Sequence, residues 1–356
     1  MKKILTYLLL ISNVAVFAQL GGIKAYSFLD LPIPARTSAL GGSSIAIWDK
    51  DVNLGYSNPA LLNPSVSKQL SFNYVNYVSD LNYGNFLYAQ QLKKYGTFAV
   101  GLQYFNYGKF DGRDEYNIET GTFRAADYCL NLAFAKTLNK DSSLSLGVAL
   151  KTIYSHYDIY NSFGSAIDVG LTYHNKKQLT VSILAKNYGK QWKPYFENGV
   201  KQSLPTDIQL GFSKKIPKAP FRVVFQYDQL LKWDLTYVNP QDQSSSIDPF
   251  TNKPIVKTDK QKRNDKIKAG LDKFGRHLTI GTEIILGKNF TIRVAYNFRK
   301  GKEMALPDVK KANGLALGFG IKISKFHFDY SFYKYALTGN AHTIGVTTNL
   351  NYFHKK

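Results

Sequence analysis

Apolar and polar residues alternate along the chain from residue 69 onward, in segments of about ten residues, the length that a tilted transmembrane strand needs. Between Phe326 and Phe332, for example, Phe and Tyr occupy every second position, and His327, Asp329 and Ser331 lie between them. Successive strand residues point to opposite faces of a sheet. Each segment is therefore predicted to be a strand with one apolar face and one polar face.

Fourteen segments show this alternation, and closed bacterial barrels have an even number of strands. A Lys or Arg facing lipid at mid-depth costs ~2–4 kcal/mol, so a barrel places its charges on the inner face. Lys136 is the exception, at a strand end where it can snorkel. The predicted strands cover 70–77, 83–92, 96–106, 127–137, 144–156, 165–174, 179–187, 206–214, 221–228, 277–286, 290–298, 313–323, 326–335 and 342–352. The predicted lumen charges are Lys151, Asp168, Lys186, Asp228, Glu283, Arg293, Lys322 and Asp329.

The connections between these strands alternate in length. Those after even-numbered strands are short, whereas 107–126, 188–205, 229–276 and 299–312 follow odd-numbered strands and are long. Short turns on one rim and long loops on the other are typical of outer-membrane barrels. A soluble sandwich also has one apolar face per strand. It needs neither such long strands nor connections that alternate between short and long. The pattern therefore predicts an all-β, antiparallel transmembrane barrel of about fourteen strands.

The stretch before the first strand has neither clean alternation nor a helical stripe. It runs "FLDLPIPARTSALGGSSIAIWDKDVNLGYSNPALLN" and is rich in Gly, Pro, Ala and Ser. A barrel of this size encloses either a pore or a plug, and residues 19–66 are the available filler. Glycines on the inner face of the predicted strands either leave room for it or permit sharp curvature of the wall. These glycines are Gly101, Gly147, Gly170, Gly211, Gly281, Gly318 and Gly320.

The first residues, "MKKILTYLLLISNVAVFA", have a basic start, an apolar run and small residues at the end. This is the pattern of a signal peptide, with cleavage after Ala18; an uncleaved anchor is the alternative. The predicted domains are then a signal peptide (1–18), a hatch (19–66) and a barrel (67–356). The predicted location is a bacterial outer membrane.

Composition limits the chemistry and the partners. The 356 residues carry a net charge of +21 and a single cysteine, so an intrachain disulfide is excluded. For an exported protein, the expected acidic partners are lipopolysaccharide phosphates or another protein rather than nucleic acid. Asp49, Asp51 and Asn53 have the spacing of a calcium loop, but Ala60 stands at its twelfth position. The sequence predicts no cofactor, no metal site and no catalytic residue, while lipases and acyltransferases built on barrels remain an enzymatic alternative.

The leader resembles the N-terminal signature of the PorQ family of outer-membrane components of the type IX secretion system. Further similar pieces are "AKNYGKQWKPY" and "VAYNFRKGKEM". More distantly, the leader is similar to PorV and to FadL-type barrels, which share an "NPA" element after a Gly-rich hatch. The residues that carry this hatch motif are Leu31, Pro32, Ala35, Arg36, Ala39, Leu40, Gly41, Gly42, Asn58, Pro59 and Ala60.

The resemblance implies a FadL-like barrel that holds PorZ at the cell surface, in one complex with PorU and PorV that joins exported cargo to lipopolysaccharide. Aromatic residues of the long loops are the candidate contacts, because Tyr and Trp dominate binding hot spots; the alternative is that those near strand ends belong to the interfacial aromatic girdle. The alternative is a FadL-like transporter of hydrophobic small molecules, which needs an apolar pocket in the lumen. The candidate loop contacts are Trp192, Tyr195, Phe196 and Trp233.

Overall fold

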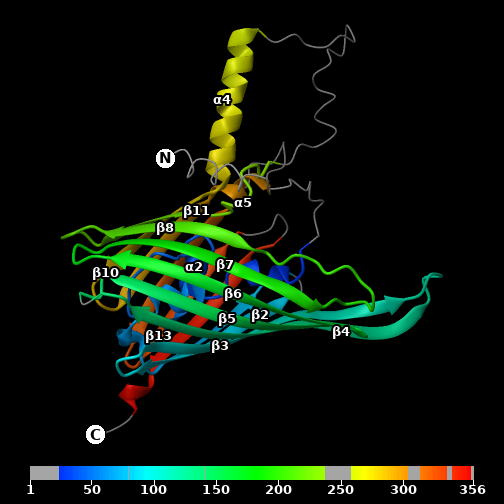
Figure 1. Cartoon of the computed structure of the whole chain (residues 1–356), viewed down its shortest axis with the longest axis horizontal. Coiled ribbons are helices and arrows are strands. Elements are labelled where there is room, and N and C mark those ends of the chain that lie inside the picture. Colours follow the sequence, from blue (N-terminus) through cyan, green and yellow to red (C-terminus); the bar gives the residue numbers. More distant parts are fainter. Residues whose placement is uncertain are drawn as a thin grey trace, which may run out of the picture.

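A computed structural model describes residues 24–78, 80–139, 141–236, 258–303, 313–334 and 339–353; the predicted signal peptide lies outside them. The described residues form a closed, fourteen-stranded antiparallel barrel (Figure 1), as the sequence predicted. Its strands are β1 (Gln69–Asn76), β2 (Asn82–Leu92), β3 (Gly96–Arg113), β4 (Glu119–Thr137), β5 (Leu144–Tyr157), β6 (Tyr160–His174), β7 (Leu179–Lys193), β8 (Asp207–Lys215), β9 (Phe221–Tyr227), β10 (Leu278–Leu286), β11 (Phe290–Asn297), β12 (Leu315–Ile323), β13 (Phe326–Tyr333) and β14 (Ala341–Asn349).

Each strand pairs with its neighbours in sequence, and β1 pairs with β14 to close the barrel. The closing register places Gln69 opposite Asn349 and Asn76 opposite His342. Closure leaves no exposed sheet edge, so every strand has two hydrogen-bonding neighbours. Within the described part of the chain, no helix is both long and apolar enough to cross a membrane.

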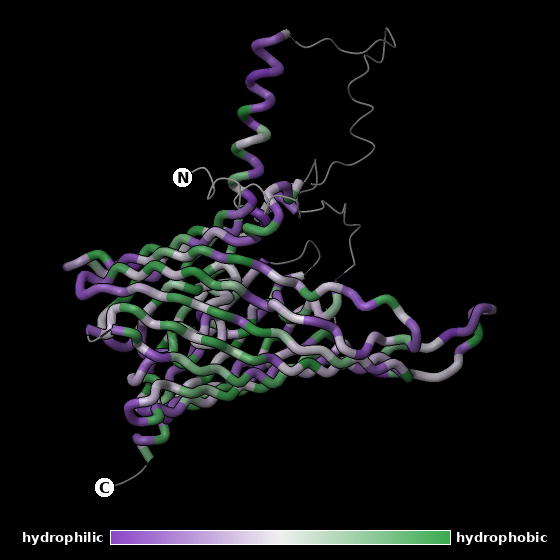
Figure 2. Tube along the Cα trace, in the orientation of Figure 1, coloured by the Kyte–Doolittle hydropathy of each residue, from purple (hydrophilic) through white to green (hydrophobic). Residues whose placement is uncertain are grey.

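The two faces of the wall differ as the alternation predicts. On β4, Tyr128 and Leu130 are exposed on the outside, whereas Cys129 and Asn131 are buried on the inside. Figure 2 shows the same mixture of apolar and polar positions along most strands. The outer face is thus an apolar belt suited to lipid, and the inner face is polar or small.

Short turns and long connections lie at opposite ends of the barrel. The end at the left of Figure 1 carries the turns after even-numbered strands and is called the short-turn end; the opposite end is called the long-loop end. One of the predicted loops is wrong over most of its length. Most of 107–126 belongs to β3 and β4, which stay paired out to Arg113 and Glu119, with Phe110 stacked on Phe123 at 5.2 Å. Cross-strand aromatic contacts stabilise a hairpin there instead.

Helices occur in two other predicted loops. Residues 229–276 contain α4 (Asp259–Arg276), which projects away from the barrel (Figure 1), and residues 299–312 begin with α5 (Phe298–Glu303). Thr258 starts α4 with a capping box, because its hydroxyl bonds the Gln261 N–H while the Gln261 side chain bonds the Thr258 N–H.

The loop prediction for 188–205 is wrong over its first six residues, because β7 continues to Lys193.

The hatch fills the lumen and supplies much of the core. At the long-loop end, Phe28 and Ile33 of the hatch pack with Val75 and Phe105 of the wall in one buried cluster. Nearer the short-turn end, hatch residues such as Val66 pack with wall residues of β2 to β5 in a second cluster. The N-terminal segment therefore fits a plug and is held by apolar contacts along its length.

Candidate functional site

The hatch is a series of short helices joined by tight turns. Asp51 and Asn58 cap two of these helices by accepting hydrogen bonds from the main-chain N–H groups of Asn53 and Ala60. Pro59 follows at a first helical position, where its missing N–H costs nothing. Capped short pieces of this kind give a compact plug. The elements are η1 (Ser27–Asp30), α2 (Ala35–Ala39), α3 (Val52–Ser57), η2 (Pro59–Leu61) and η3 (Pro64–Val66).

The residues of the predicted hatch motif lie inside the barrel. Leu31 and Gly42 are partly buried, and the other nine are buried. Gly41 and Gly42 have positive φ angles of 88° and 98°, which glycine adopts without strain. The resulting turn rests on the wall, because the Asn297 side chain and the Tyr333 hydroxyl donate hydrogen bonds to the Gly41 carbonyl at 3.2 and 3.1 Å.

Glycines of the inner wall mark where the hatch approaches closest. A Cβ added at Gly147 would overlap main-chain atoms of Pro59 and Ala60, and one added at Gly170 would overlap the Asn58 side chain. The "NPA" element of the hatch therefore lies directly against two wall glycines. In the same way, Gly211 faces Ile45 and Ala46, Gly281 faces Leu40, and Gly318 faces Ala39.

Arg36 connects the hatch to the wall through ion pairs. Its Nε donates to Glu283 Oε1 at 2.8 Å, and its other nitrogens donate to Asp49 at 2.9 Å and Asp51 at 3.0 Å. Glu283 belongs to β10 and is fully buried. A planar guanidinium suits several carboxylates at once. One hatch side chain thus joins a strand of the wall to the turn that precedes α3.

Two wall arginines extend this arrangement. Arg222 pairs with Glu283 at 2.6 Å and with Asp49 at 3.1 Å, and Arg293 pairs with Glu283 at 3.0 Å and with Asp329 at 2.6 Å. Glu283 therefore accepts from three arginines, which offset the cost of burying its charge. The hatch–wall ion cluster is defined as Arg36, Asp49, Asp51, Arg222, Glu283, Arg293 and Asp329.

The ion pairs of Asp49 persist in mild acid. Burial raises the pKa of the hatch carboxyl Asp49, but attraction by Arg36 and Arg222 outweighs burial and holds this pKa well below its usual range. A lowered folded-state pKa gives stability that is present above the ordinary pKa and lost only as the pH falls toward the lowered value. Neutral and weakly acidic conditions therefore leave Asp49 charged and paired.

The remaining predicted lumen charges lie apart from this cluster. Lys151 pairs with Asp168 at 2.6 Å, and Lys186 lies 3.5 Å from Asp30 of the hatch. Lys322 is exposed at the short-turn end. Asp228 is buried just beyond β9, 3.7 Å from Arg299 of α5.

The calcium-like spacing does not hold a metal ion in this arrangement. Asp49 and Asp51 point to Arg36, and Asp51 also caps α3. Among the residues that the structure describes, no group of three or more His, Cys, Asp or Glu side chains could hold a metal ion.

An aromatic cleft opens at the long-loop end, over the start of the hatch. It has a volume of about 370 Å³, and Tyr and Phe rings form most of its walls. Apolar ring faces with hydroxyl edges suit an aromatic or amphiphilic ligand. The lining is Lys24, Ala25, Tyr26, Ser27, Tyr107, Tyr157, Tyr160, Tyr195, Phe196 and Gln202.

A buried carboxylate links the tyrosines of this cleft through hydrogen bonds. Asp127 accepts hydrogen bonds from the hydroxyls of Tyr107 at 2.7 Å, Tyr157 at 3.0 Å and Ser155, and Ser155 also bonds Tyr195 at 2.7 Å. The sequence indicated Tyr195 as a loop aromatic, but not the gathering of Tyr107, Tyr157 and Tyr195 around Asp127. Their positions are 20 to 68 residues from Asp127, so only the folded wall brings them together.

The four candidate loop contacts occupy three places. Tyr195 and Phe196 line the aromatic cleft. Trp192, at the end of β7, is exposed, and its Nε1 donates to Ser165 at 2.8 Å. Trp233 is exposed beside the start of β10, with its ring stacked on His277 at 5.5 Å.

Comparison with known proteins identifies the fold. No family model and no curated protein matches the sequence. Among solved structures, the Pseudomonas putida toluene transporter TodX covers 89% of this chain and 97% of its own at 11% identity and a TM-score of 0.51. The Ralstonia pickettii toluene transporter TbuX covers 90% of this chain and 99% of its own, at 12% identity and a TM-score of 0.51. The CymD monoaromatic hydrocarbon channel covers 91% of this chain and 97% of its own, at 14% identity and a TM-score of 0.50. The chain thus has a FadL-like barrel fold.

Proposed function

We propose that this chain is a non-enzymatic outer-membrane barrel that docks a surface partner on its long-loop end. The short-turn end then faces the periplasm. The resemblance to the PorQ family supports PorZ as the partner, with PorU and PorV in the same complex and lipopolysaccharide around the barrel. The barrel would set the depth and orientation of the partner without doing chemistry.

The observation that carries this proposal is the filled lumen. The hatch is packed against wall glycines and joined to the wall by the buried ion cluster, whereas apolar side chains are exposed outside at the long-loop end. A platform for a partner needs a rigid wall and an adhesive outer surface. Such a platform does not need a passage through the lumen.

Helix α4 is the most prominent docking element among the described residues. Ile267, Leu271 and Phe274 are 53%, 66% and 48% exposed and follow a spacing of four and three residues, which places them on one face. The other positions are mostly Lys, Arg and Asp. Such a helix fits helix-in-groove recognition by a partner.

The helix gives a test of docking. Replacing Ile267 and Leu271 by Asp is expected to reduce partner recovery at least about tenfold, since two apolar anchors together contribute more than ~1.4 kcal/mol. The control replaces Lys262 and Lys266, on the polar part of the helix, by Gln. Recovery is measured by quantitative mass spectrometry after purification in mild detergent. Equal recovery by both variants would exclude the apolar face of α4 as the dock.

A second candidate is the uptake of hydrophobic small molecules. The fold comparisons favour it over docking, because the structural neighbours are named as transporters or channels of toluene and other monoaromatic hydrocarbons. The aromatic cleft supports it, because it would receive such a ligand above the hatch.

The two candidates predict different behaviour for an immobilised hatch. A Cβ added at Gly345 lies 3.4 Å from the Ala35 Cβ and would displace the end of the Asn73 side chain; the separation is close to the ~3.8 Å of a disulfide. The double variant Ala35→Cys, Gly345→Cys, with Cys129→Ser, would fix the hatch to β14 when oxidised. Docking predicts unchanged partner recovery. Uptake predicts a loss of labelled toluene entry that a reductant reverses, with the two single-Cys variants as controls.

A further inference from the structure

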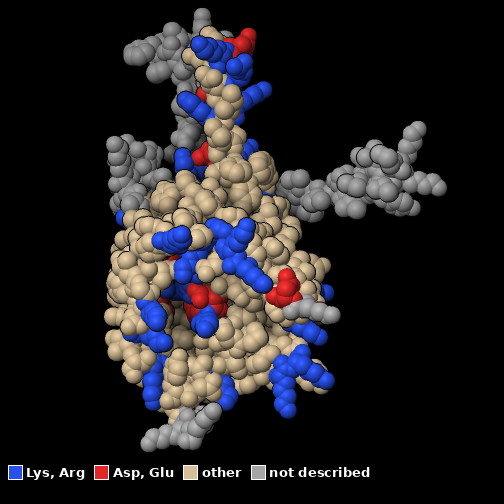
Figure 3. Space-filling model, turned by 90° about the vertical axis from the view of Figure 1, so that its left-hand side faces the viewer, with Lys and Arg blue, Asp and Glu red and all other residues tan. Residues whose placement is uncertain are grey.

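The short-turn end contains a second recess, on the side of the barrel away from the aromatic cleft. It has a volume of about 590 Å³ and lies between the hatch and the wall strands β10 to β14 and β1. Its floor includes Arg36, Glu283 and Arg293 of the hatch–wall ion cluster. Figure 3 looks onto this end and shows basic side chains gathered around a hollow with acidic side chains inside it.

The charges of this recess do not balance. Its three acidic residues, Asp49, Asp51 and Glu283, are each paired with arginine in the ion cluster. Lys50, Lys288, Lys322 and Lys325 also line the recess, and none of them forms a salt bridge with a carboxylate of the described chain. The ion cluster has three arginines against four carboxylates, so the four lysines leave the recess with a net positive charge.

Neutral hydrogen-bonding groups stand between these lysines. Thr291, Thr347, Thr348 and Asn349 line the same space. The Lys322 and Lys325 ammonium groups lie 5.8 and 4.7 Å above the rings of Tyr352 and Phe353, which keeps both beside the opening. Lysine ammonium groups and hydroxyls together are typical partners of phosphate.

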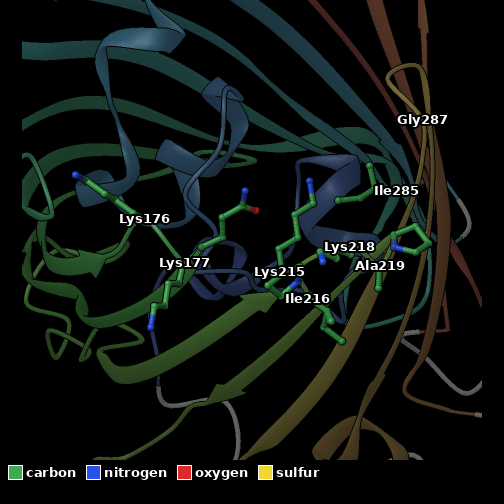
Figure 4. A pocket seen from close by; sticks show the side chains of 11 residues that line it. Lys176, Lys177, Lys215, Ile216, Lys218, Ala219, Ile285 and Gly287 are labelled. Atoms are coloured by element: carbon green, nitrogen blue, oxygen red, sulfur yellow. The ribbon is translucent and has the colours of Figure 1, made fainter.

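An adjoining recess adds more lysines. It has a volume of about 600 Å³ and shares Ile285 with the recess described above. Lys176, Lys177, Lys215 and Lys218 line it, from the turn after β6, the end of β8 and the turn after β8 (Figure 4). Like charges that converge in a concave surface raise the local concentration of anions.

We propose that the short-turn mouth is a binding site for a phosphate-bearing anion. Lys288, Lys322 and Lys325 hold the phosphate, and the hydroxyl and amide groups between them orient it. The site does not depend on which of the two functions the long-loop end performs. The phosphate could come from a phospholipid headgroup of the inner leaflet or from a soluble periplasmic anion.

Calorimetric titration of the purified full-length barrel in a neutral detergent tests this site. The probes are pyrophosphate and the water-soluble lipid dihexanoylphosphatidylglycerol, with dihexanoylphosphatidylcholine as the zwitterionic reference. Replacing Lys322 and Lys325 by Gln is expected to weaken binding about tenfold or more, because each lysine near an anionic group contributes appreciably to the affinity for it. The control replaces Lys93 and Lys94 by Gln, in the turn after β2 and outside both recesses.

Each result has one meaning for the proposal. Binding that falls with added salt, and that is lost in the Lys322, Lys325 variant but kept in the control, supports it. Preference for the lipid then assigns a headgroup, and preference for pyrophosphate assigns a soluble anion. Absence of binding by both anionic probes, or an equal loss in both variants, overturns it. The replaced lysines, Lys322 and Lys325 in the variant and Lys93 and Lys94 in the control, are all exposed, so both proteins should fold. The salt dependence of wild-type binding is an independent check.

Discussion

Replacing Glu283 by Ala is expected to lower the free energy of unfolding by about 3–5 kcal/mol, the usual cost of removing one partner from a buried ion pair. Three arginines, Arg36, Arg222 and Arg293, would lose a shared carboxylate inside the barrel. Since Arg36 belongs to the hatch, the hatch should also become accessible to protease from the short-turn end. Guanidinium unfolding in detergent and limited proteolysis measure the two effects.

A surface ion pair provides the matched control. Arg113 and Glu119 pair at 2.9 Å near the tip of the β3–β4 hairpin, where their side chains are 44% and 72% exposed. Exposed pairs contribute ~0–1 kcal/mol, so Glu119→Ala should change stability little and leave the hatch protected. Similar losses in the two variants would show that the buried ion cluster does not fix the hatch.

Replacing Gly147 by Ala is expected to destabilise the protein by about 1–3 kcal/mol, as overpacking of a filled interior does. The added methyl group would overlap the main chain at Pro59 and Ala60, which cannot move as a flexible side-chain end can. Either the "NPA" element of the hatch must shift or β5 must bend outward. Thermal unfolding and protease protection of the hatch report the change.

Helix α4 offers the same substitution where there is space. Among the described residues, no atom lies within 4 Å of a Cβ added at Gly270. Because Ala is the better helix former by ~1 kcal/mol, Gly270→Ala should be neutral or slightly stabilising. Equal melting temperatures for the Gly147 and Gly270 variants would contradict the close contact between hatch and wall.

Much of the barrel could be predicted from the sequence because a lipid-facing wall imposes a strict two-residue period. Phe326 to Phe332, for instance, could form a strand only with its aromatic side facing lipid. The outer part of the β3–β4 hairpin and helix α4 are two of the elements that escaped this reasoning. The outer part of the β3–β4 hairpin contains Gly108, Gly112 and several charges, and its pairing depends on contacts between the two strands. Helix α4 has few apolar residues, although Thr258 and Gln261 carried a capping signal.

The candidate sites were less predictable because they depend on distant residues. The charge of Glu283 and the Gly-rich hatch could both be noted in the sequence, but Arg36 and Glu283 are 247 positions apart. The aromatic cleft likewise joins Tyr26 to Tyr195. Alternation shows which way a side chain points, and only the three-dimensional structure shows what it meets in the lumen.

We propose that the long-loop end of the plugged barrel docks a surface partner. The most direct test is purification of the tagged protein from outer membranes in mild detergent, with mass spectrometry of bound proteins and lipids. Docking predicts recovery of PorZ, with PorU and PorV in smaller amounts. A barrel that emerges without these proteins and carries a hydrophobic small molecule would contradict docking and establish uptake as the better account.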